Sequence, residues 1–232
     1  MAPARWRHRN GADRERTRYG WRSPSVFDVA QSLQKRAYLS HRSAAFLNGL
    51  TDEPGPEIYV NIEQSPKPQP EGRLLQESID RAFKNKQRQS QFNYIFQNTR
   101  ITVLNGKNTA RLGVTTIVGP SGGSVDVTSL ERTLIDLAVR PSYAGGVEQV
   151  LGAYRAAKQR ASVKRLLATL NRLDYVYPYH QAIGFDMERA GFDAPSYEKL
   201  RRLGLQFDFY LSHEIGDRAY DPNWRPYIPN GL

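Results

Sequence analysis

The sequence contains no cysteine, which excludes disulfide bonds, zinc–thiolate centres and thiol catalysis. It also lacks any apolar run that approaches the roughly 20 residues needed by a membrane-spanning helix. The N-terminus is rich in arginine and has no apolar stretch behind it, so the pattern of a secretory signal is missing. These absences predict a cytoplasmic protein with no membrane partner.

Acidic residues are few relative to basic ones. The 232 residues include 33 Lys and Arg but only 23 Asp and Glu, which gives a net charge of +10. A surplus of this size attracts polyanions and makes nucleic acid, above all DNA, the expected partner, with an acidic protein surface as the alternative. The surplus is clustered, and the candidate contact residues are Arg5, Arg7, Arg9, Arg14, Arg16, Arg18, Lys84, Lys86, Arg88, Arg155, Lys158, Arg160, Lys164 and Arg165.

The order of local patterns predicts an α+β fold, with a mixed, strand-rich N-terminal half followed by a helical half and short closing strands. Residues 1–18 are polar and dense in arginine, which predicts a flexible basic arm. Residues 19–118 are expected to form an α+β part with a proline-rich loop at 65–70. Residues 119–232 are expected to form a mainly helical part.

Periodicity and turn residues predict the individual elements. Helices are expected at 26–33, 40–47, 74–86, 129–138, 146–160, 162–172 and 180–190. Strands are expected at 57–62, 93–96, 100–104, 112–118, 125–127, 206–211 and 224–228. Asn105-Gly106 predicts a hairpin turn, and residues 120–124 predict a second turn.

The segment from Thr128 to Pro141 holds the densest set of local signals. Thr128 and Glu131 match the capping-box pattern, in which each side chain bonds the backbone N–H of the other residue. Arg132 and Asp136 are spaced to form an ion pair on one helix face. A capped helix docked on a sheet explains most of this pattern, and contact of Arg132 or Asp136 with a partner is the functional alternative.

Few residues support catalysis. Asp126, Glu131 and Asp136 follow a Gly-Gly-Ser turn, but their spacing does not match the paired strand carboxylates of two-metal nucleotidyltransferases. The four histidines have no second ligand at metal-binding spacing, and His180 among its tyrosines is typical of a hydrogen-bonded core cluster. Ser40 and His41 have no identifiable third member of a triad. The sequence therefore predicts no metal, no cofactor and no enzymatic activity.

Four blocks of sequence carry a family resemblance, and they span most of residues 19–230. They are Tyr38-Leu-Ser-His-Arg-Ser-Ala-Ala-Phe-Leu-Asn-Gly-Leu50, Pro56-Glu-Ile-Tyr-Val60, Leu130-Glu-Arg-Thr-Leu-Ile-Asp136 with Gly145-Gly146, and Tyr177-Pro-Tyr-His-Gln-Ala-Ile-Gly-Phe185 with Glu188-Arg-Ala-Gly191. In these blocks and in their order, the chain resembles the AbiEi-type antitoxins of type IV toxin–antitoxin (abortive infection) systems.

The resemblance implies a DNA-binding transcriptional repressor that also counteracts a toxin, typically a nucleotidyltransferase encoded beside it, directly or indirectly. It implies that residues 119–232 form an antitoxin-type part, and it marks as family-motif positions Ser40, His41, Glu131, Arg132, Asp136 and His180. The family's N-terminal winged helix-turn-helix does not fit into the 18 residues before Tyr19, so no complete module of this kind is expected.

The leading hypothesis is therefore a non-enzymatic antitoxin that also contacts DNA as an autoregulatory repressor. Two alternatives stay open. One is a basic nucleic-acid-binding module with no toxin. The other is a relic of a metal-dependent nuclease or nucleotidyltransferase that uses Asp126, Glu131 and Asp136.

Overall fold

The computed structural model describes residues 3–8, 15–19, 24–68 and 72–232, and within these ranges it describes side chains from residue 24 onwards. The chain divides into two compact units, neither of which is continuous in sequence. Unit 1 combines residues 1–67 with 89–129, and unit 2 combines residues 68–88 with 130–232. The division thus falls at residue 129 and not at 118, and residues 68–88 belong to the second unit.

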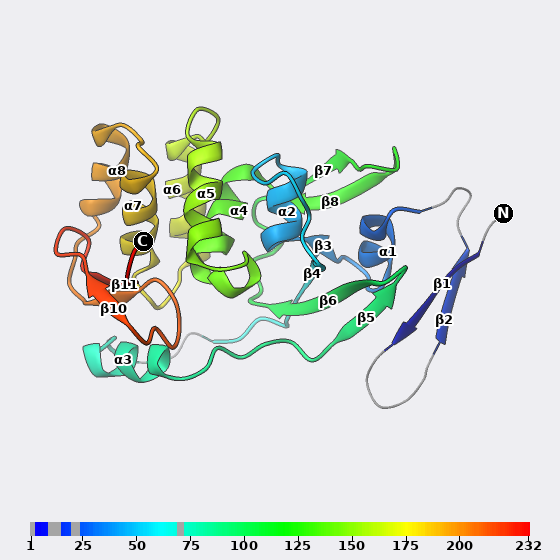
Figure 1. Cartoon of the computed structure of the whole chain (residues 1–232), viewed down its shortest axis with the longest axis horizontal. Coiled ribbons are helices and arrows are strands. Elements are labelled where there is room, and N and C mark those ends of the chain that lie inside the picture. The colour runs from blue at the N-terminus through cyan, green and yellow to red at the C-terminus, as the bar shows by residue number, and fades with distance from the viewer. Residues whose placement is uncertain (1–2, 9–14, 20–23, 69–71) are drawn as a thin grey trace. The chain divides into compact units, whose positions relative to one another are not determined.

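Unit 1 is built on a mixed sheet of eight strands in the order β2-β1-β5-β6-β4-β3-β8-β7 (Figure 1). The pairs β4/β6 and β3/β8 are parallel, and the other neighbours are antiparallel. The strands are β1 (Pro3–His8), β2 (Glu15–Tyr19), β3 (Tyr38–Leu39), β4 (Glu57–Glu63), β5 (Asn93–Phe96), β6 (Thr99–Gly106), β7 (Val114–Val118) and β8 (Ser124–Thr128).

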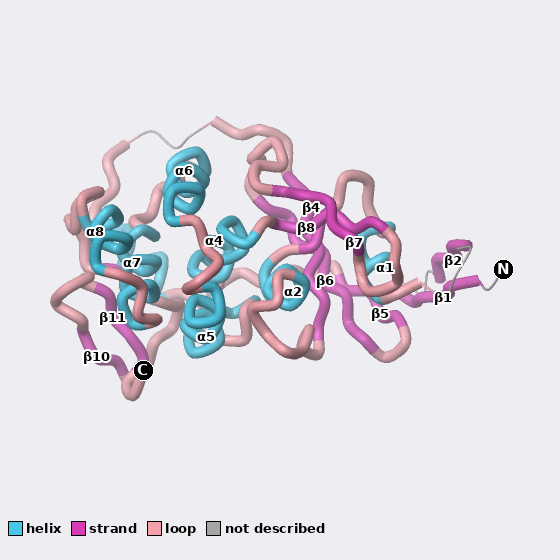
Figure 2. The backbone as a smooth tube through the Cα atoms, turned by 90° about the horizontal axis from the view of Figure 1, so that it is seen from above, coloured by secondary structure: helices cyan, strands magenta, loops and turns pink. Residues whose placement is uncertain are grey.

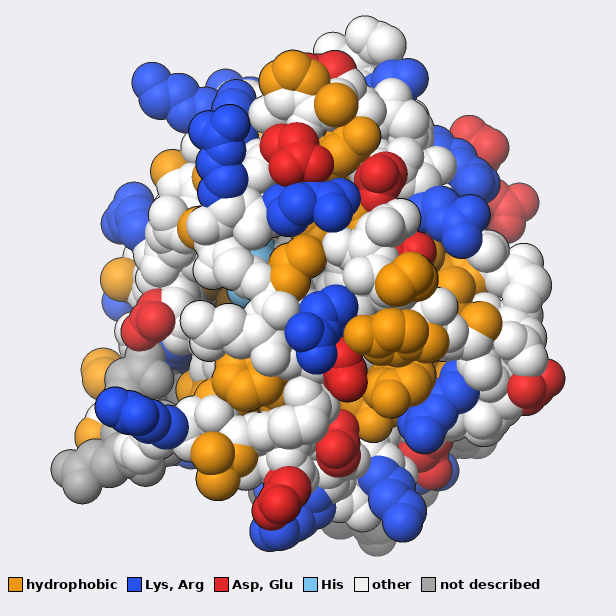
Figure 3. Space-filling model, turned by 90° about the vertical axis from the view of Figure 1, so that its left-hand side faces the viewer, with side chains coloured by type: hydrophobic (Ala, Val, Ile, Leu, Met, Phe, Trp, Pro, Cys, Tyr) orange, Lys and Arg blue, Asp and Glu red, His pale blue; other side chains and the backbone are white. Residues whose placement is uncertain are grey.

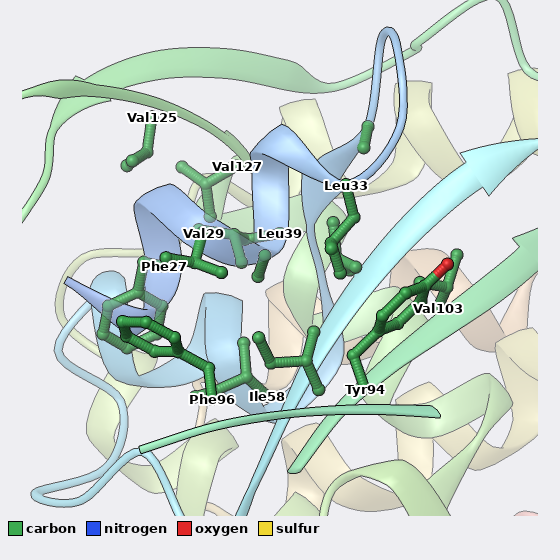
Figure 4. Close-up of a cluster of buried hydrophobic side chains, with 14 of the residues drawn as sticks. Phe27, Val29, Leu33, Leu39, Ile58, Tyr94, Phe96, Val103, Val125 and Val127 are labelled. Atoms are coloured by element: carbon green, nitrogen blue, oxygen red, sulfur yellow. The ribbon is translucent and has the colours of Figure 1, made fainter. Parts of the chain in front are cut away.

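Helices α1 (Val26–Ser32) and α2 (His41–Leu47) provide the apolar side chains that cover this sheet. Phe27 and Phe46 stack with their ring centroids 5.8 Å apart, which joins the two helices. The buried side chains of α1 meet alternate residues of the strands in one cluster, shown in Figure 4, that includes Phe27, Val29, Leu33, Leu39, Ile58, Tyr94, Phe96, Val103, Val125 and Val127. Period-2 alternation in the strands places these residues on one face of the sheet.

Helix α1 begins where the sequence predicted, because Ser25 and Asp28 form a capping box. The Ser25 hydroxyl accepts from the Asp28 N–H at 3.3 Å, and the Asp28 carboxylate accepts from the Ser25 N–H at 2.8 Å. Burial alone would raise the pKa of Asp28, but hydrogen bonds from Ser121 and Ser25 outweigh it and lower that pKa. The cap therefore also connects α1 to the turn that follows β7.

Unit 2 contains most of the helices, which lie next to one another in Figures 1 and 2. They are α3 (Gln76–Lys84), α4 (Leu130–Val139), α5 (Val147–Ala157), α6 (Val163–Leu173), α7 (Tyr179–Arg189) and α8 (Ala194–Arg201), with a 3-10 turn at Pro141–Tyr143. A small sheet of three strands, in the order β10-β11-β9, completes the unit. Its strands are β9 (Phe209–Tyr210), β10 (Arg218–Tyr220) and β11 (Pro226–Pro229).

The core of unit 2 forms around large side chains that are fully buried, namely Tyr154, Phe185, Phe209 and Trp224. Trp224 packs directly on the backbone of α7 at Gly184, and its indole N–H donates to Glu188 at 2.5 Å. Helix α3 joins this unit through the Gln76 side chain, which donates to the Asp208 carbonyl and accepts from the Asp208 N–H, both at 2.8 Å. These long-range contacts explain why residues 68–88 belong to unit 2.

The N-terminal segment differs from the predicted flexible arm. Residues 3–8 and 15–19 are paired antiparallel strands, with Arg5 opposite Thr17, and β1 also pairs with β5. The prediction followed the density of arginine and missed the alternation of arginine with Trp6, Thr17 and Tyr19, a pattern typical of strands. Arg9 and Arg14 lie outside the described residues.

The hairpin turn predicted at Asn105-Gly106 is wrong. Both residues lie inside β6, where they pair in parallel with Ile62 and Glu63 of β4. The turn that joins β5 to β6 is Gln97-Asn98, whose φ angles are 46° and 66°. Two consecutive residues with positive φ are what a tight hairpin turn requires, and asparagine tolerates this conformation better than most residues.

The capping box predicted between Thr128 and Glu131 stays a prediction. Thr128 is the last residue of β8, and α4 begins at Leu130. The Glu131 carboxylate accepts from the Ser162 N–H, 2.9 Å away, and from Arg165. Glu131 therefore makes a tertiary contact that the local sequence pattern did not suggest.

The overall architecture is α+β, with its strands mainly in the first half of the sequence and its helices mainly in the second, as predicted. The proline-rich stretch is without helix or strand over residues 65–68. In the described part of the chain, no helix has the length and apolar character needed to cross a membrane.

Candidate nucleic-acid interface

The end of α5, all of α6 and the loop between them carry a run of basic side chains that we call the α5–α6 surface. Leu166, Leu170 and Leu173 are the buried residues of α6, and Tyr154 and Ala157 end the buried face of α5. Because these apolar positions recur at helical spacing, the residues between them face solvent. The exposed basic residues are Arg155, Lys158, Arg160, Lys164, Arg165 and Arg172.

The charge of the α5–α6 surface is largely uncompensated. No acidic residue occurs between positions 154 and 173. Arg165 forms an ion pair with Glu131 at 2.9 Å, yet its own side chain stays 70% exposed. Within the described part of the chain, Arg155, Lys158, Lys164 and Arg172 form no ion pair. The surface can therefore offer several cations to a polyanion without first breaking an internal salt bridge.

Glu131 holds the start of α6 and the Arg165 side chain in place. Its carboxylate accepts from the backbone N–H of Ser162, the N-cap of α6, and from Nε and Nη2 of Arg165 at 3.1 and 2.9 Å. Burial alone would raise the pKa of Glu131, but the Ser162 and Arg165 hydrogen bonds outweigh it and lower the pKa. A carboxylate at the N-terminus of α6 also interacts favourably with the helix dipole. Glu131 thus positions the start of the basic helix.

The predicted ion pair between Arg132 and Asp136 is confirmed, with Nε and Oδ1 separated by 2.7 Å. Both side chains are buried, so neither is placed to contact a partner. Burial raises the pKa of Asp136 more than the neighbouring Arg132 guanidinium lowers it. The central sequence signature therefore serves the packing of α4 in this structure.

The three carboxylates of the nucleotidyltransferase alternative each have an arginine partner. Asp126 bonds Arg111 at 2.5 Å, Glu131 bonds Arg165, and Asp136 bonds Arg132. Among the described residues, no group of three or more His, Asp or Glu side chains is arranged to hold a metal ion. An arginine at each carboxylate competes with a cation for the same oxygens.

Ser40 and His41 lie side by side, with Ser40 Oγ 2.9 Å from His41 Nδ1. Ser40 is 1% exposed, which leaves its hydroxyl inaccessible to a substrate in this conformation. His41 has a φ of 51°, and the Ser40 N–H donates to the Tyr59 carbonyl. Ser43 Oγ accepts from the Tyr59 N–H at 2.8 Å. This motif therefore attaches the start of α2 to β4.

His180 lies half-buried near the start of α7. Its Nε2 lies 2.6 Å from the carbonyl oxygen of Gly204, so it forms a hydrogen bond with the backbone. Burial lowers the pKa of His180 more than the Gly204 hydrogen bond raises it, which favours the neutral ring. A neutral, backbone-bonded imidazole fits the structural role that the sequence suggested.

The remaining candidate cations are spread over other elements. Lys84, Lys86 and Arg88 are exposed at and beyond the end of α3. For Arg5, Arg7, Arg16 and Arg18 only the backbone is described, in β1 and β2.

Sequence reasoning missed a row of tyrosines across the small sheet. Tyr220, Tyr227 and Tyr210 are register neighbours on β10, β11 and β9. The Arg218 guanidinium carbon lies 4.4 Å from the centroid of the Tyr227 ring. In the sequence, the alternation Arg218-Ala-Tyr220 was the signal that could have predicted a strand here.

Figure 3 shows hydrophobic side chains gathered on one face of the molecule, among basic and acidic side chains that are mixed there.

Comparisons with known proteins show the fold alone. No family model matches the chain, and no curated protein matches it. Among solved structures, the chain is similar to the RV2827C protein from Mycobacterium tuberculosis, with a TM-score of 0.52 and 14% sequence identity. The similarity covers 82% of this chain and 61% of that one, so this chain spans less than two thirds of that protein.

Proposed function

We propose that this protein is the antitoxin of a type IV toxin–antitoxin system, acts in the cytoplasm, and contacts nucleic acid through its α5–α6 surface. It counteracts a nucleotidyltransferase-type toxin and represses its own operon by contacting DNA. The observation that carries the proposal is the set of exposed cations on α5 and α6, most of which form no ion pair within the described part of the chain. The family resemblance supplies the toxin and the operon.

The physical reasoning starts from the phosphate backbone of nucleic acid. Each cation that neutralises a phosphate releases a condensed counterion, so the affinity falls by about 0.9 powers of the salt concentration per contact. The surface exposes Arg155, Lys158, Lys164 and Arg172, which carry no internal ion pair in the described part of the chain. Binding by these residues recognises the backbone and gives little sequence specificity by itself.

A salt titration tests the nucleic-acid contact. We expect double-stranded DNA binding by the full chain to weaken steeply with salt. The double variant Lys158→Gln/Lys164→Gln should lower the slope of log affinity against log salt by about 1.8, since two contacts are lost. The matched control Lys35→Gln/Lys199→Gln changes the net charge equally at exposed positions that are not among the residues of this surface, and it should leave the slope unchanged. Equal slopes in both variants would refute the proposed interface.

A co-expression assay tests the antitoxin role. The neighbouring nucleotidyltransferase-type gene should arrest growth when induced alone, and this chain should restore growth. If the neighbour is harmless alone, the antitoxin role is wrong. If the neighbour is toxic and this chain does not relieve the arrest while still binding DNA, the protein is a basic nucleic-acid-binding module without a toxin.

The enzymatic alternative has less support than the antitoxin role, because each of its candidate carboxylates forms an ion pair with an arginine. Asp126, Glu131 and Asp136 each bond an arginine. If the relic hypothesis held, Asp136→Asn would abolish a metal-dependent activity of the purified chain on nucleic acid or nucleotides. We expect the wild-type chain to show no such activity with magnesium or manganese.

A further inference from the structure

Strand β7 forms one edge of the eight-stranded sheet, since its only neighbour in the described sheet is β8 (Figure 2). Its sequence, Val-Thr-Thr-Ile-Val, consists entirely of β-branched residues and contains no charge and no proline. Thr115, Thr116 and Val118 are exposed, Val118 to 76%. Edge strands are usually protected by charges, prolines or bulges, because an open edge pairs readily with another strand. Strand β7 has neither a charged residue nor a proline to protect its edge.

The hydrogen bonds of β8 show which backbone groups of β7 remain available. Ser129 N–H donates to the Gly113 carbonyl, and Gly119 N–H donates to the Gly123 carbonyl. In an antiparallel pair, the residues that bond the partner strand alternate with residues whose N–H and C=O point the other way. Positions 113, 115, 117 and 119 therefore face β8. Thr116 and Val118 direct their N–H and C=O groups to the open edge.

The same strand in a second copy is a suitable partner for this edge. When β7 pairs antiparallel with itself about Thr116, Thr116 lies opposite Thr116 of the other copy and Val114 lies opposite Val118. Thr115 then lies opposite Ile117. Every pair is uncharged, so no like charges meet, and the Thr–Thr and β-branched pairs are of the kind that stabilise sheets. The two-fold symmetry uses the same patch on both subunits, as homodimers commonly do.

We propose that β7 is a self-association edge, through which two copies of this chain form a dimer with one continuous sheet. The contact is isologous and antiparallel, and it is centred on Thr116. This inference does not depend on the antitoxin role, since it concerns the sheet of unit 1 alone.

The absence of cysteine in the chain makes a site-specific cross-linking test possible. The Thr116→Cys variant should form a disulfide-linked dimer under mild oxidation. Its Cα would lie about 5.5 Å from that of the same residue in the other copy. This distance is within the range of about 4.4–6.8 Å that disulfides span. Position 115 of the control Thr115→Cys is also exposed, but its Cα would lie about 7–8 Å from its symmetry mate, beyond that range.

Sedimentation equilibrium of the full chain gives the second measurement. We expect a dimer that dissociates on dilution and is lost in Thr116→Pro, because proline removes an N–H that faces the open edge while the bonds to β8 remain. Thr115→Val should dimerise as the wild type does. A wild-type chain that stays monomeric, or equal cross-linking at positions 115 and 116, would overturn the proposal. A dimer that instead survives Thr116→Pro without cross-linking through Cys at 116 would also overturn it, by placing the interface elsewhere.

Discussion

Gly184 of α7 is a position where a single methyl group should destabilise unit 2. A Cβ added at this residue would lie 2.1 Å from Cζ3 and 2.3 Å from Cη2 of Trp224. Carbon atoms in good contact are about 3.5–4.0 Å apart, so the indole ring would have to move by more than 1 Å. The ring is fully buried, its N–H bonds Glu188, and the Arg201 guanidinium lies 4.5 Å from its centroid. These contacts leave the ring little freedom to move.

We therefore expect Gly184→Ala to destabilise the protein by about 2 kcal/mol. Overpacking of a core costs about 1–3 kcal/mol, and here we expect the upper end, from which about 1 kcal/mol of helix propensity gained by alanine is subtracted. In a protein of this size the change corresponds to a fall in Tm of about 4–8 °C. Thermal unfolding followed by circular dichroism measures it, together with the urea midpoint.

Gly152 in α5 provides the matched control. It is a helical glycine at which an added Cβ meets nothing within 4 Å, so Gly152→Ala should stabilise the protein by about 0.5–1 kcal/mol. The two substitutions are chemically identical and differ only in what surrounds the methyl group. If Gly184→Ala proves as stable as Gly152→Ala, the close packing of Trp224 on α7 is wrong.

Three further predictions concern single side chains. Burial raises the pKa of Asp186 well above its usual range, so the folded state holds a proton at pH values where the unfolded state has released it. The free energy of unfolding therefore falls as the pH rises from the ordinary pKa of 3.8 through the raised pKa of the folded state. Asp186→Asn should therefore raise the urea midpoint at pH 8 more than at pH 5, and a shift that does not depend on pH would contradict this. The pKa of Glu131 is lowered, so its contribution to stability is present above the ordinary value of 4.5 and is lost as the pH falls from that value through the lower pKa of the folded state. Glu131→Gln should cost about 1 kcal/mol at pH 7, a modest value because Arg165 is largely exposed, and in urea titrations the cost should shrink as the pH is lowered below 4.5. Ser25→Ala should cost about 1 kcal/mol in the same titrations through loss of the α1 cap, and an unchanged midpoint would refute the capping box there.

The sequence predicted elements well where one local signal was sufficient. Helix α1 follows Ser25, β4 lies within one residue of the expected range, and the turn after β7 is where its glycines suggested. Prediction failed where a distant contact decided the outcome. Asn105-Gly106 continues β6 because β4 lies beside it. Helix α8 and strand β10 were missed because each is short and has weak periodicity.

The candidate interface was only partly predictable for the same reason. The run of cations between Arg155 and Arg172 is visible in the sequence, and helical spacing correctly implied that it faces solvent. The ion pair of Arg165 could not be predicted, because its partner Glu131 is 34 positions earlier. The open edge of β7 likewise depends on the strand order, which local patterns do not give.

The positions of the charged residues separate the parts of the sequence that fold the protein from those available for recognition. In the segment that carries the family resemblance, Glu131, Arg132 and Asp136 are all buried and bonded within unit 2. Replacing Arg132 or Asp136 removes the partner of a buried charge, and replacing Glu131 removes the contacts that hold the start of α6; both changes destabilise a protein whatever it binds. The cations at Lys158 and Lys164 are exposed, and neutralising them should change binding with little effect on folding. A variant set that includes both groups therefore distinguishes loss of the fold from loss of the interface. If substitutions at Lys158 and Lys164 instead lowered the unfolding midpoint as much as Glu131→Gln, these lysines would stabilise the fold, and the α5–α6 surface would not be a recognition surface.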